Sequence, residues 1–237
     1  MTAAGPVIPE FGKGSACVTG DHVFCWDWVR DHWDDTLQPS LVDHVELTLI
    51  AVAVGFAIAF ALALLAHRVP GVGQPVGVAA ALIYTIPSLA IFQILVPFFG
   101  LSTTTVEIPL VGYSLVMLYP NILAGLQAAT PEVLEAARAM GLERRQVLLR
   151  VELPLAVPAI VGGLRLAVVS TVSIATIAAF LGEQGLGYPI FQALKQPTPF
   201  KTEIYAAGAL VVALALACDL VLVAARRLLV PWARAGS

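Results

Sequence analysis

The 237-residue chain has few charged residues: Asp, Glu, Lys and Arg make up 12% of it, about half the share found in soluble domains. Apolar residues make up 59%, and the mean hydropathy is +0.87. Together these values predict an integral membrane protein. The net charge is only −3, and no basic stripe carries interleaved aromatic residues, so nucleic acid is excluded as an expected partner.

Cysteine and the signatures of catalysis are also scarce. The three cysteines, Cys17, Cys25 and Cys218, are too few for a cysteine-rich zinc cluster. No HExxH, GxSxG or Walker A pattern occurs, and no histidine falls in the middle of an apolar segment. We therefore expect no catalytic centre, no metal and no cofactor. A membrane hydrolase is disfavoured because it needs a nucleophile beside a base. The N-terminal segment lacks a basic region followed by an apolar core, so we expect no cleaved signal peptide.

Five apolar segments are long enough to cross a bilayer, which takes roughly 20 residues in a helix. The second segment, 75–99, contains Pro87 and is expected to form one kinked helix, with two short helices as the alternative. The expected fold class is an all-α polytopic membrane protein with about five transmembrane helices. The other four expected spans are 41–66, 106–128, 157–181 and 203–225.

The distribution of lysine and arginine orients these spans. If the N-terminus lies outside, the inner segments 67–74, 129–156 and 226–237 hold eight of these residues, and the outer segments hold four. Positively charged residues gather on the cytoplasmic side of membrane proteins. We therefore predict a multi-pass protein of the cell membrane with its N-terminus outside and its C-terminus in the cytoplasm.

The chain is expected to divide into an extracytoplasmic tail (1–40), a membrane domain (41–228) and a cytoplasmic tail (229–237). The outer tail contains Cys17 and Cys25. Disulfides persist in oxidising compartments, which predicts a bridge between these two residues. Two free thiols in the tail are the alternative.

A charged stretch, 131–152, interrupts the apolar pattern between the third and fourth expected spans. Thr130 is a suitable N-cap and Pro131 suits the first helical position, so a helix is expected to begin here. Gly141 offers its C-terminal end. A second helix is expected to follow, and Pro154 to end it. The balanced charge of the stretch favours docking against a protein over lying on lipid, where more basic residues are typical.

This stretch resembles the EAA loop of ABC-type import permeases. That motif reads Glu-Ala-Ala, three residues, Gly, nine residues, an aliphatic residue, any residue and Leu-Pro. The resemblance implies that 41–228 is a type I permease domain and that the loop is a coupling helix seated in a separate ATP-binding subunit. It also implies a second permease chain, identical or different, since five spans are too few to enclose a path. The matching residues are Glu135, Ala136, Ala137, Gly141, Val151, Leu153 and Pro154, with Val151 where Ile is usual.

The phrases "YTIPSLAIFQILVPFFG" and "IAAFLGEQGLGYPI" resemble the osmoprotectant permeases of ABC importers, which carry glycine betaine, carnitine or choline. This resemblance covers about 41–225 and implies a separate substrate-binding protein outside the membrane. Methionine-type permeases share the five-span plan and the EAA loop, and they are the alternative. A secondary transporter is disfavoured because the chain shows no inverted repeat.

Two charged residues interrupt the fourth and fifth expected spans. Arg165 and Asp219 lie at similar depths from the cytoplasmic side. Charge inside a bilayer is costly and is usually functional, which favours an ion pair or a shared polar site. The alternative is that Arg165 snorkels to the interface while Asp219 bonds to backbone or water.

Polar and proline residues beside the family phrases are candidates for the translocation path. We single out Tyr84, Pro87 and Asn121. For polar side chains of this kind, hydrogen bonding between helices is the alternative role. His44, near the outer end of the first span, is expected to lie at the membrane interface.

Overall fold

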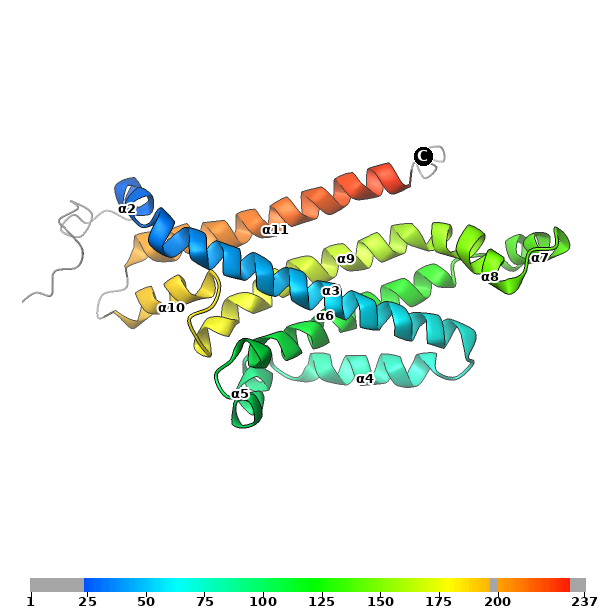
Figure 1. Cartoon of the computed structure of the whole chain (residues 1–237), viewed down its shortest axis with the longest axis horizontal. Helices are drawn as coiled ribbons and strands as arrows, with labels where there is room; N and C mark the ends of the chain where they lie inside the picture. Colours follow the sequence, from blue (N-terminus) through cyan, green and yellow to red (C-terminus); the bar gives the residue numbers. More distant parts are fainter. Residues whose placement is uncertain (1–23, 197–199, 231–237) are drawn as a thin grey trace, which may run out of the picture.

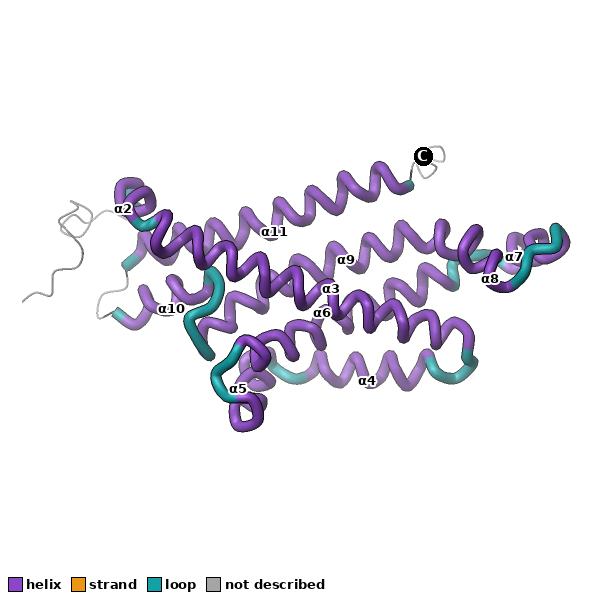
Figure 2. The backbone as a smooth tube through the Cα atoms, in the orientation of Figure 1, coloured by secondary structure: helices purple, strands orange, loops and turns teal. Residues whose placement is uncertain are grey.

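The computed structural model describes residues 24–196 and 200–230, and the regular elements in these ranges are all helices (Figure 1). Figure 2 shows short loops joining the helices within the described ranges. This confirms the predicted all-α membrane architecture. Within these ranges, four helical segments are long and apolar enough to cross a membrane, or five if the bent pair described below is one span. The four are Trp33–Arg68, Thr103–Leu126, Arg144–Phe180 and Lys201–Leu229.

The first span starts earlier than the apolar pattern indicates. A short helix, α2 (Trp26–Asp31), leads into a π-helical turn, η1 (Trp33–Leu37), and then into α3 (Gln38–Arg68). The Trp28 ring packs edge-on against the Phe200 ring at 5.2 Å between centroids. Phe200 immediately precedes α11 (Lys201–Leu229). The start of the described chain is therefore fixed against the start of the last helix.

The second apolar segment forms two helices. These are α4 (Gly73–Thr85) and α5 (Ser88–Phe99), and they meet at an angle of 94°. Proline disfavours a helical conformation in the residue before it, and Ile86 before Pro87 is extended, with ψ of 124°. A break of this size exceeds a kink, so the two-helix alternative describes the segment. The 13 residues of α4 span about 20 Å, short of a bilayer core of about 30 Å.

The fourth span continues without interruption from the charged loop. Pro154 was expected to end a helix, but one helical rod runs through it from Arg144 to Phe180. A π-helical turn precedes it, in which the Leu153 N–H bonds to the Leu148 carbonyl. Such a turn shifts the hydrogen-bond pattern at the position where proline lacks its N–H. The rod consists of α8 (Arg144–Val147), η2 (Leu148–Glu152), α9 (Leu153–Ala175) and η3 (Thr176–Phe180).

The core lies where α3, α6 (Thr103–Leu126) and α9 pack against one another, with α4 on α6 and α11 on α9. Small residues allow these helices to approach closely. A Cβ atom built on Gly55 of α3 would lie 1.9 Å from Ser114 Oγ of α6. One built on Gly125 of α6 would lie 3.0 Å from the Ala156 carbonyl of α9. Membrane helices associate mainly through such packing, because lipid supplies no hydrophobic drive between them.

The two ends of the bundle differ (Figure 1). The short helices α7 (Pro131–Ala139) and α8 project from the end where α11 finishes, which we call the α7 end. The helices α2 and α10 (Gly187–Lys195) lie at the opposite end, which we call the α10 end. Because α3, α6 and α9 each run between these ends, they connect whatever binds at one end to the other.

Replacing Gly55 with Ala should destabilise the protein by about 1–3 kcal/mol, the usual cost of overpacking. The new methyl group would overlap Ser114 Oγ. Thermal denaturation in detergent measures the effect, and Gly77→Ala is the control because nothing lies within 4 Å of its added Cβ. The double variant Gly55→Ala/Ser114→Ala should recover part of the loss. Equal melting temperatures for Gly55→Ala and Gly77→Ala would contradict the close contact.

Candidate functional site

The charged loop folds into two helices separated by a tight turn. Pro131 occupies the first turn of α7. Gly141 then takes φ of +81°, a backbone conformation that glycine adopts without steric cost. The following helix starts with a capping box, in which the Glu143 N–H donates to Gln146 Oε1 at 2.9 Å. The structure thus contains the helix, glycine turn and second helix that the sequence indicates.

The residue expected to cap α7 is at the N-cap position, but its side chain makes a different hydrogen bond. Thr130 stands at the N-cap position, but its side chain caps no backbone N–H. Its hydroxyl bonds instead to Glu132, and this hydrogen bond holds the pKa of the Glu132 carboxyl below its usual value. Glu132 therefore stays ionised at the positive end of α7, where negative charge is favourable.

The motif residues are distributed between the surface of the loop and its interior. Glu135, Ala136 and Gly141 are exposed, whereas Ala137 is buried, with 2% exposure. The Ala137 carbonyl accepts a hydrogen bond from the Leu142 N–H across the glycine turn. Of the two alanines in the motif, Ala136 is thus open to a partner surface, whereas the Ala137 side chain is buried.

The apolar side chains on the loop tip add to its exposed surface. Val133 and Met140 are 42% and 73% exposed. Farther along, Leu153 and Pro154 are half-buried at the start of α9, where the loop joins the bundle. The tip therefore presents apolar and charged groups side by side, which is a surface suited to a protein partner.

One contact of the loop region has no counterpart in the sequence-based expectations. Glu152, at the end of the π-helical turn, is only 9% exposed, and its Oε2 lies 3.0 Å from His67 Nε2. His67 stands at the C-terminal end of α3. The pair therefore joins the first span to the start of the fourth. The sequence signal for this contact is that Glu152, between Val151 and Leu153, is an acidic residue in the variable position of the motif.

Arg165 and Asp219 form a bidentate ion pair between α9 and α11. Arg165 Nε donates to Asp219 Oδ1 at 2.7 Å, and Nη2 donates to Oδ2 at 2.9 Å. The side chains are 35% and 26% exposed in the single chain, and with Ser170 they line a cavity of about 300 Å³. Lipid accommodates such charges poorly. This face of the bundle is thus suited to water or to another protein chain.

Tyr84 and Pro87 lie at the elbow between α4 and α5. Tyr84 is 57% exposed, and its ring meets that of Tyr113 edge-on at 6.4 Å. The Tyr113 hydroxyl donates to the carbonyl of Ile86, which the break at Pro87 leaves without a helical partner. Tyr113 of α6 thus holds the elbow in place.

Asn121 lies elsewhere, at the contact between α6 and α9. Its Nδ2 donates to the Met117 carbonyl at 2.7 Å within α6. A Cβ atom on Gly163 of α9 would lie 2.7 Å from Asn121 Cβ. The structure therefore does not bring Asn121 together with Tyr84 and Pro87, and its contacts are those of a residue packed between helices.

The His44 side chain is buried inside the bundle, with 0% exposure, and its position at the level of the membrane interface stays a prediction. Its Nε2 lies 3.0 Å from the Val172 carbonyl, and its Nδ1 lies 3.1 Å from the Leu186 N–H. These partners require a neutral ring protonated at Nε2. Gly185, with φ of +64°, lies so close that an added Cβ would be 2.9 Å from His44 Nδ1. The imidazole thus fastens the 182–186 loop to α3 and α9.

Residues 51–235 match the family described as the binding-protein-dependent transport system inner membrane component. The chain belongs to this family. The choline transport system permease protein OpuBB of Bacillus subtilis is 34% identical to it over 191 residues, which cover 80% of this chain and 86% of that protein. The carnitine transport permease protein OpuCB of Listeria monocytogenes is 33% identical over 156 residues, 66% of this chain and 72% of that protein. The osmoprotectant import permease protein OsmW of Salmonella typhimurium is 38% identical over 148 residues, 60% of this chain and 69% of that protein.

A solved structure has the same fold as this chain. The inward-facing MetNI methionine ABC transporter matches this permease with a TM-score of 0.74 at 19% identity. The match covers 84% of this chain and 98% of that one. The permease therefore has the type I importer fold that the EAA loop implies.

The predicted disulfide of the permease involves a residue outside the described ranges. Cys17 lies in the part of the chain that is not described, so the bridge between Cys17 and Cys25 stays a prediction. The Cys25 backbone N–H donates to Thr202 Oγ1 at 3.1 Å, which places Cys25 beside the start of α11.

A double-mutant cycle tests the Arg165–Asp219 pair of the permease. Removing one partner leaves the other charge unpaired within the membrane, which costs more than removing both. We expect Arg165→Ala and Asp219→Ala each to lower the melting temperature, and Arg165→Ala/Asp219→Ala to restore part of the loss. Ser170→Ala, in the same cavity but outside the ion pair, is the control. Strictly additive losses would show that the two side chains do not interact.

Proposed function

We propose that this permease forms the translocation path of an ATP-driven importer for an osmoprotectant such as glycine betaine, carnitine or choline. The observation that carries the proposal is the α7 loop. It presents an EAA motif, with Glu135 and Gly141 exposed, at one end of a type I permease bundle. The substrate class rests on the relatives, whose names state choline, carnitine and osmoprotectant transport.

The proposed partner at the α7 end is a separate ATP-binding subunit. The sequence contains no Walker A pattern, so this chain does not supply the ATPase. Ala136, Val133 and Met140 offer close approach and apolar contact, and Glu135 adds charge. Gly141 forms the turn at which α7 leaves the rod, and Leu153 and Pro154 lie farther along, at the start of α9 within the rod. Binding of ATP can shift the permease between states only if it favours one of them.

The proposed path requires a second permease chain, identical or different. Arg165, Asp219 and Tyr84 are part-exposed on this single chain, and a facing chain would enclose them. An extracytoplasmic substrate-binding protein would then dock at the α10 end. In this arrangement the tail 1–40 lies outside, 41–228 forms the membrane domain, and 229–237 lies in the cytoplasm. The fold match to the methionine transporter does not favour methionine as the substrate, because 19% identity supports the fold alone.

Reversing the charge of Glu135 should lower uptake by weakening the contact with the ATPase. Glu135 is exposed on α7, so Glu135→Lys should leave folding of the permease unchanged. We expect loss of co-purification with the ATPase and at least about a tenfold fall in uptake, which corresponds to about 1.4 kcal/mol. Glu183→Lys, which changes an exposed residue at the α10 end, is the matched control for co-purification with the ATPase. Wild-type co-purification and uptake by Glu135→Lys would refute the coupling role.

A further inference from the structure

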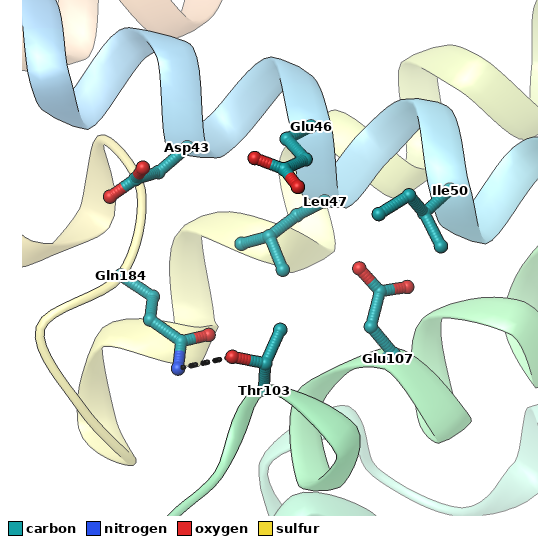
Figure 3. A pocket seen from close by; sticks show the side chains of 7 residues that line it. All are labelled: Asp43, Glu46, Leu47, Ile50, Thr103, Glu107 and Gln184. Atoms are coloured by element: carbon teal, nitrogen blue, oxygen red, sulfur yellow. Dashed lines mark hydrogen bonds between the residues drawn. The ribbon is translucent and has the colours of Figure 1, made fainter.

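A small acidic cavity opens at the α10 end, between α3, α6 and the 182–186 loop (Figure 3). Its volume is about 200 Å³. Figure 3 shows the side chains of Glu46 from α3 and Glu107 from α6 extending toward each other across it. Its lining residues are Asp43, Glu46, Leu47, Ile50, Thr103, Glu107 and Gln184.

The buried side-chain atoms in this cavity that lack hydrogen-bond partners are all acceptors. Both carboxylate oxygens of Glu107 and the amide oxygen of Gln184 are buried, and no residue in the described ranges donates a hydrogen bond to them. The Gln184 amide nitrogen, in contrast, bonds to Thr103 Oγ1 at 3.4 Å. A buried polar atom without a partner is costly. Since all three unpartnered atoms are acceptors, the complementary occupant carries positive charge or hydrogen-bond donors.

The charge of the lining points in the same direction. Glu107 shares the cavity with the carboxylates of Asp43 and Glu46, and no lysine, arginine or histidine is among the lining residues. Like charges at short range in a partly water-excluded site repel one another. A cation between them converts that repulsion into attraction, so the cavity is built to select positive charge.

The geometry fits an organic cation better than a metal ion. Among the described residues, no group of three or more His, Cys, Asp or Glu side chains is arranged to hold a metal. Hard cations such as Ca²⁺ need about six to eight oxygen ligands at close range. Here Leu47 and Ile50 of α3 also line the cavity, so apolar groups lie beside the carboxylates (Figure 3). A methylated ammonium, with its charge spread over apolar methyl groups, matches both kinds of group.

We propose that this cavity binds the quaternary ammonium group of the transported osmoprotectant as it enters from the α10 end. The inference rests on the proposed function, because that function brings such a substrate to this end of the bundle. The negative lining attracts the ammonium group and repels a carboxylate. Cationic choline therefore depends on Glu107 more strongly than zwitterionic glycine betaine does.

The test measures choline binding to the purified permease–ATPase complex without the binding protein, by equilibrium dialysis. Glu107→Gln, which keeps the size of the side chain and removes its charge, should weaken choline binding about tenfold. Glu183→Gln, an exposed neighbour outside the lining, should bind as the wild type does. The neutral choline isostere 3,3-dimethylbutan-1-ol should not compete. In reconstituted vesicles, Glu107→Gln should also lower the ratio of choline uptake to glycine betaine uptake.

Several outcomes overturn the proposal. Wild-type choline affinity in both Glu107→Gln and Asp43→Asn would do so. Asp43 is exposed, so Asp43→Asn tests the charge of the lining without changing a buried residue. Competition by Ca²⁺ or Na⁺ beyond that of an inert salt of equal ionic strength would assign the cavity to inorganic cations. Equal competition by the neutral isostere would remove the role of charge. Failure of the wild-type complex to import glycine betaine, carnitine or choline would instead refute the proposed function, independently of the binding measurements on the variants.

Discussion

The close approach of α3, α6 and α9 is the constraint on which the rest of the structure depends. Helices in lipid gain little from hydrophobic burial against each other, so they need small residues where they cross. Gly55 lets α3 reach Ser114, and Gly125 lets α6 reach the Ala156 backbone. Every polar feature described above uses at least one of these three helices or the segments joined to them. A change in their spacing would move all of those features together.

The membrane spans and the α7 turn could be predicted from the sequence, because the first depend on lipid and the second on local backbone chemistry. Spans follow from hydropathy because backbone polar groups in a bilayer must be satisfied within each helix. The α7 turn follows from Pro131 and Gly141 because each acts within a few residues. Contacts such as His44 with Leu186 or His67 with Glu152 join residues 142 and 85 positions apart. They depend on helix register, which a segment apolar on all sides does not reveal.

The effect of a proline on a helix also depends on contacts that the sequence does not reveal. Pro87 separates two helices, and the Tyr113 hydroxyl, from a third helix, donates a hydrogen bond to the freed Ile86 carbonyl. Pro154 instead lies inside a continuous rod, because the π-helical turn before it has already shifted the hydrogen bonds. Both prolines follow apolar residues in the sequence. The difference arises from what surrounds the freed backbone groups, so it emerges only with the packed structure.

The rod from Arg144 to Phe180 connects the polar contacts of the bundle. Glu152 meets α3 near the α7 end, Arg165 meets α11 farther along, and the Val172 carbonyl meets His44 toward the α10 end. The glycine turn at Gly141 separates α7 from this rod, whereas no break separates α8 from α9. In the proposed importer, a force applied to α7 thus reaches the membrane through α8. Because the rod is one continuous helix, we expect it to move as a unit. The contacts of Glu152, Arg165 and Val172 would then all move or all stay in place. That coupling relates the docking end to the acidic cavity, since His44 also fastens the loop that carries Gln184.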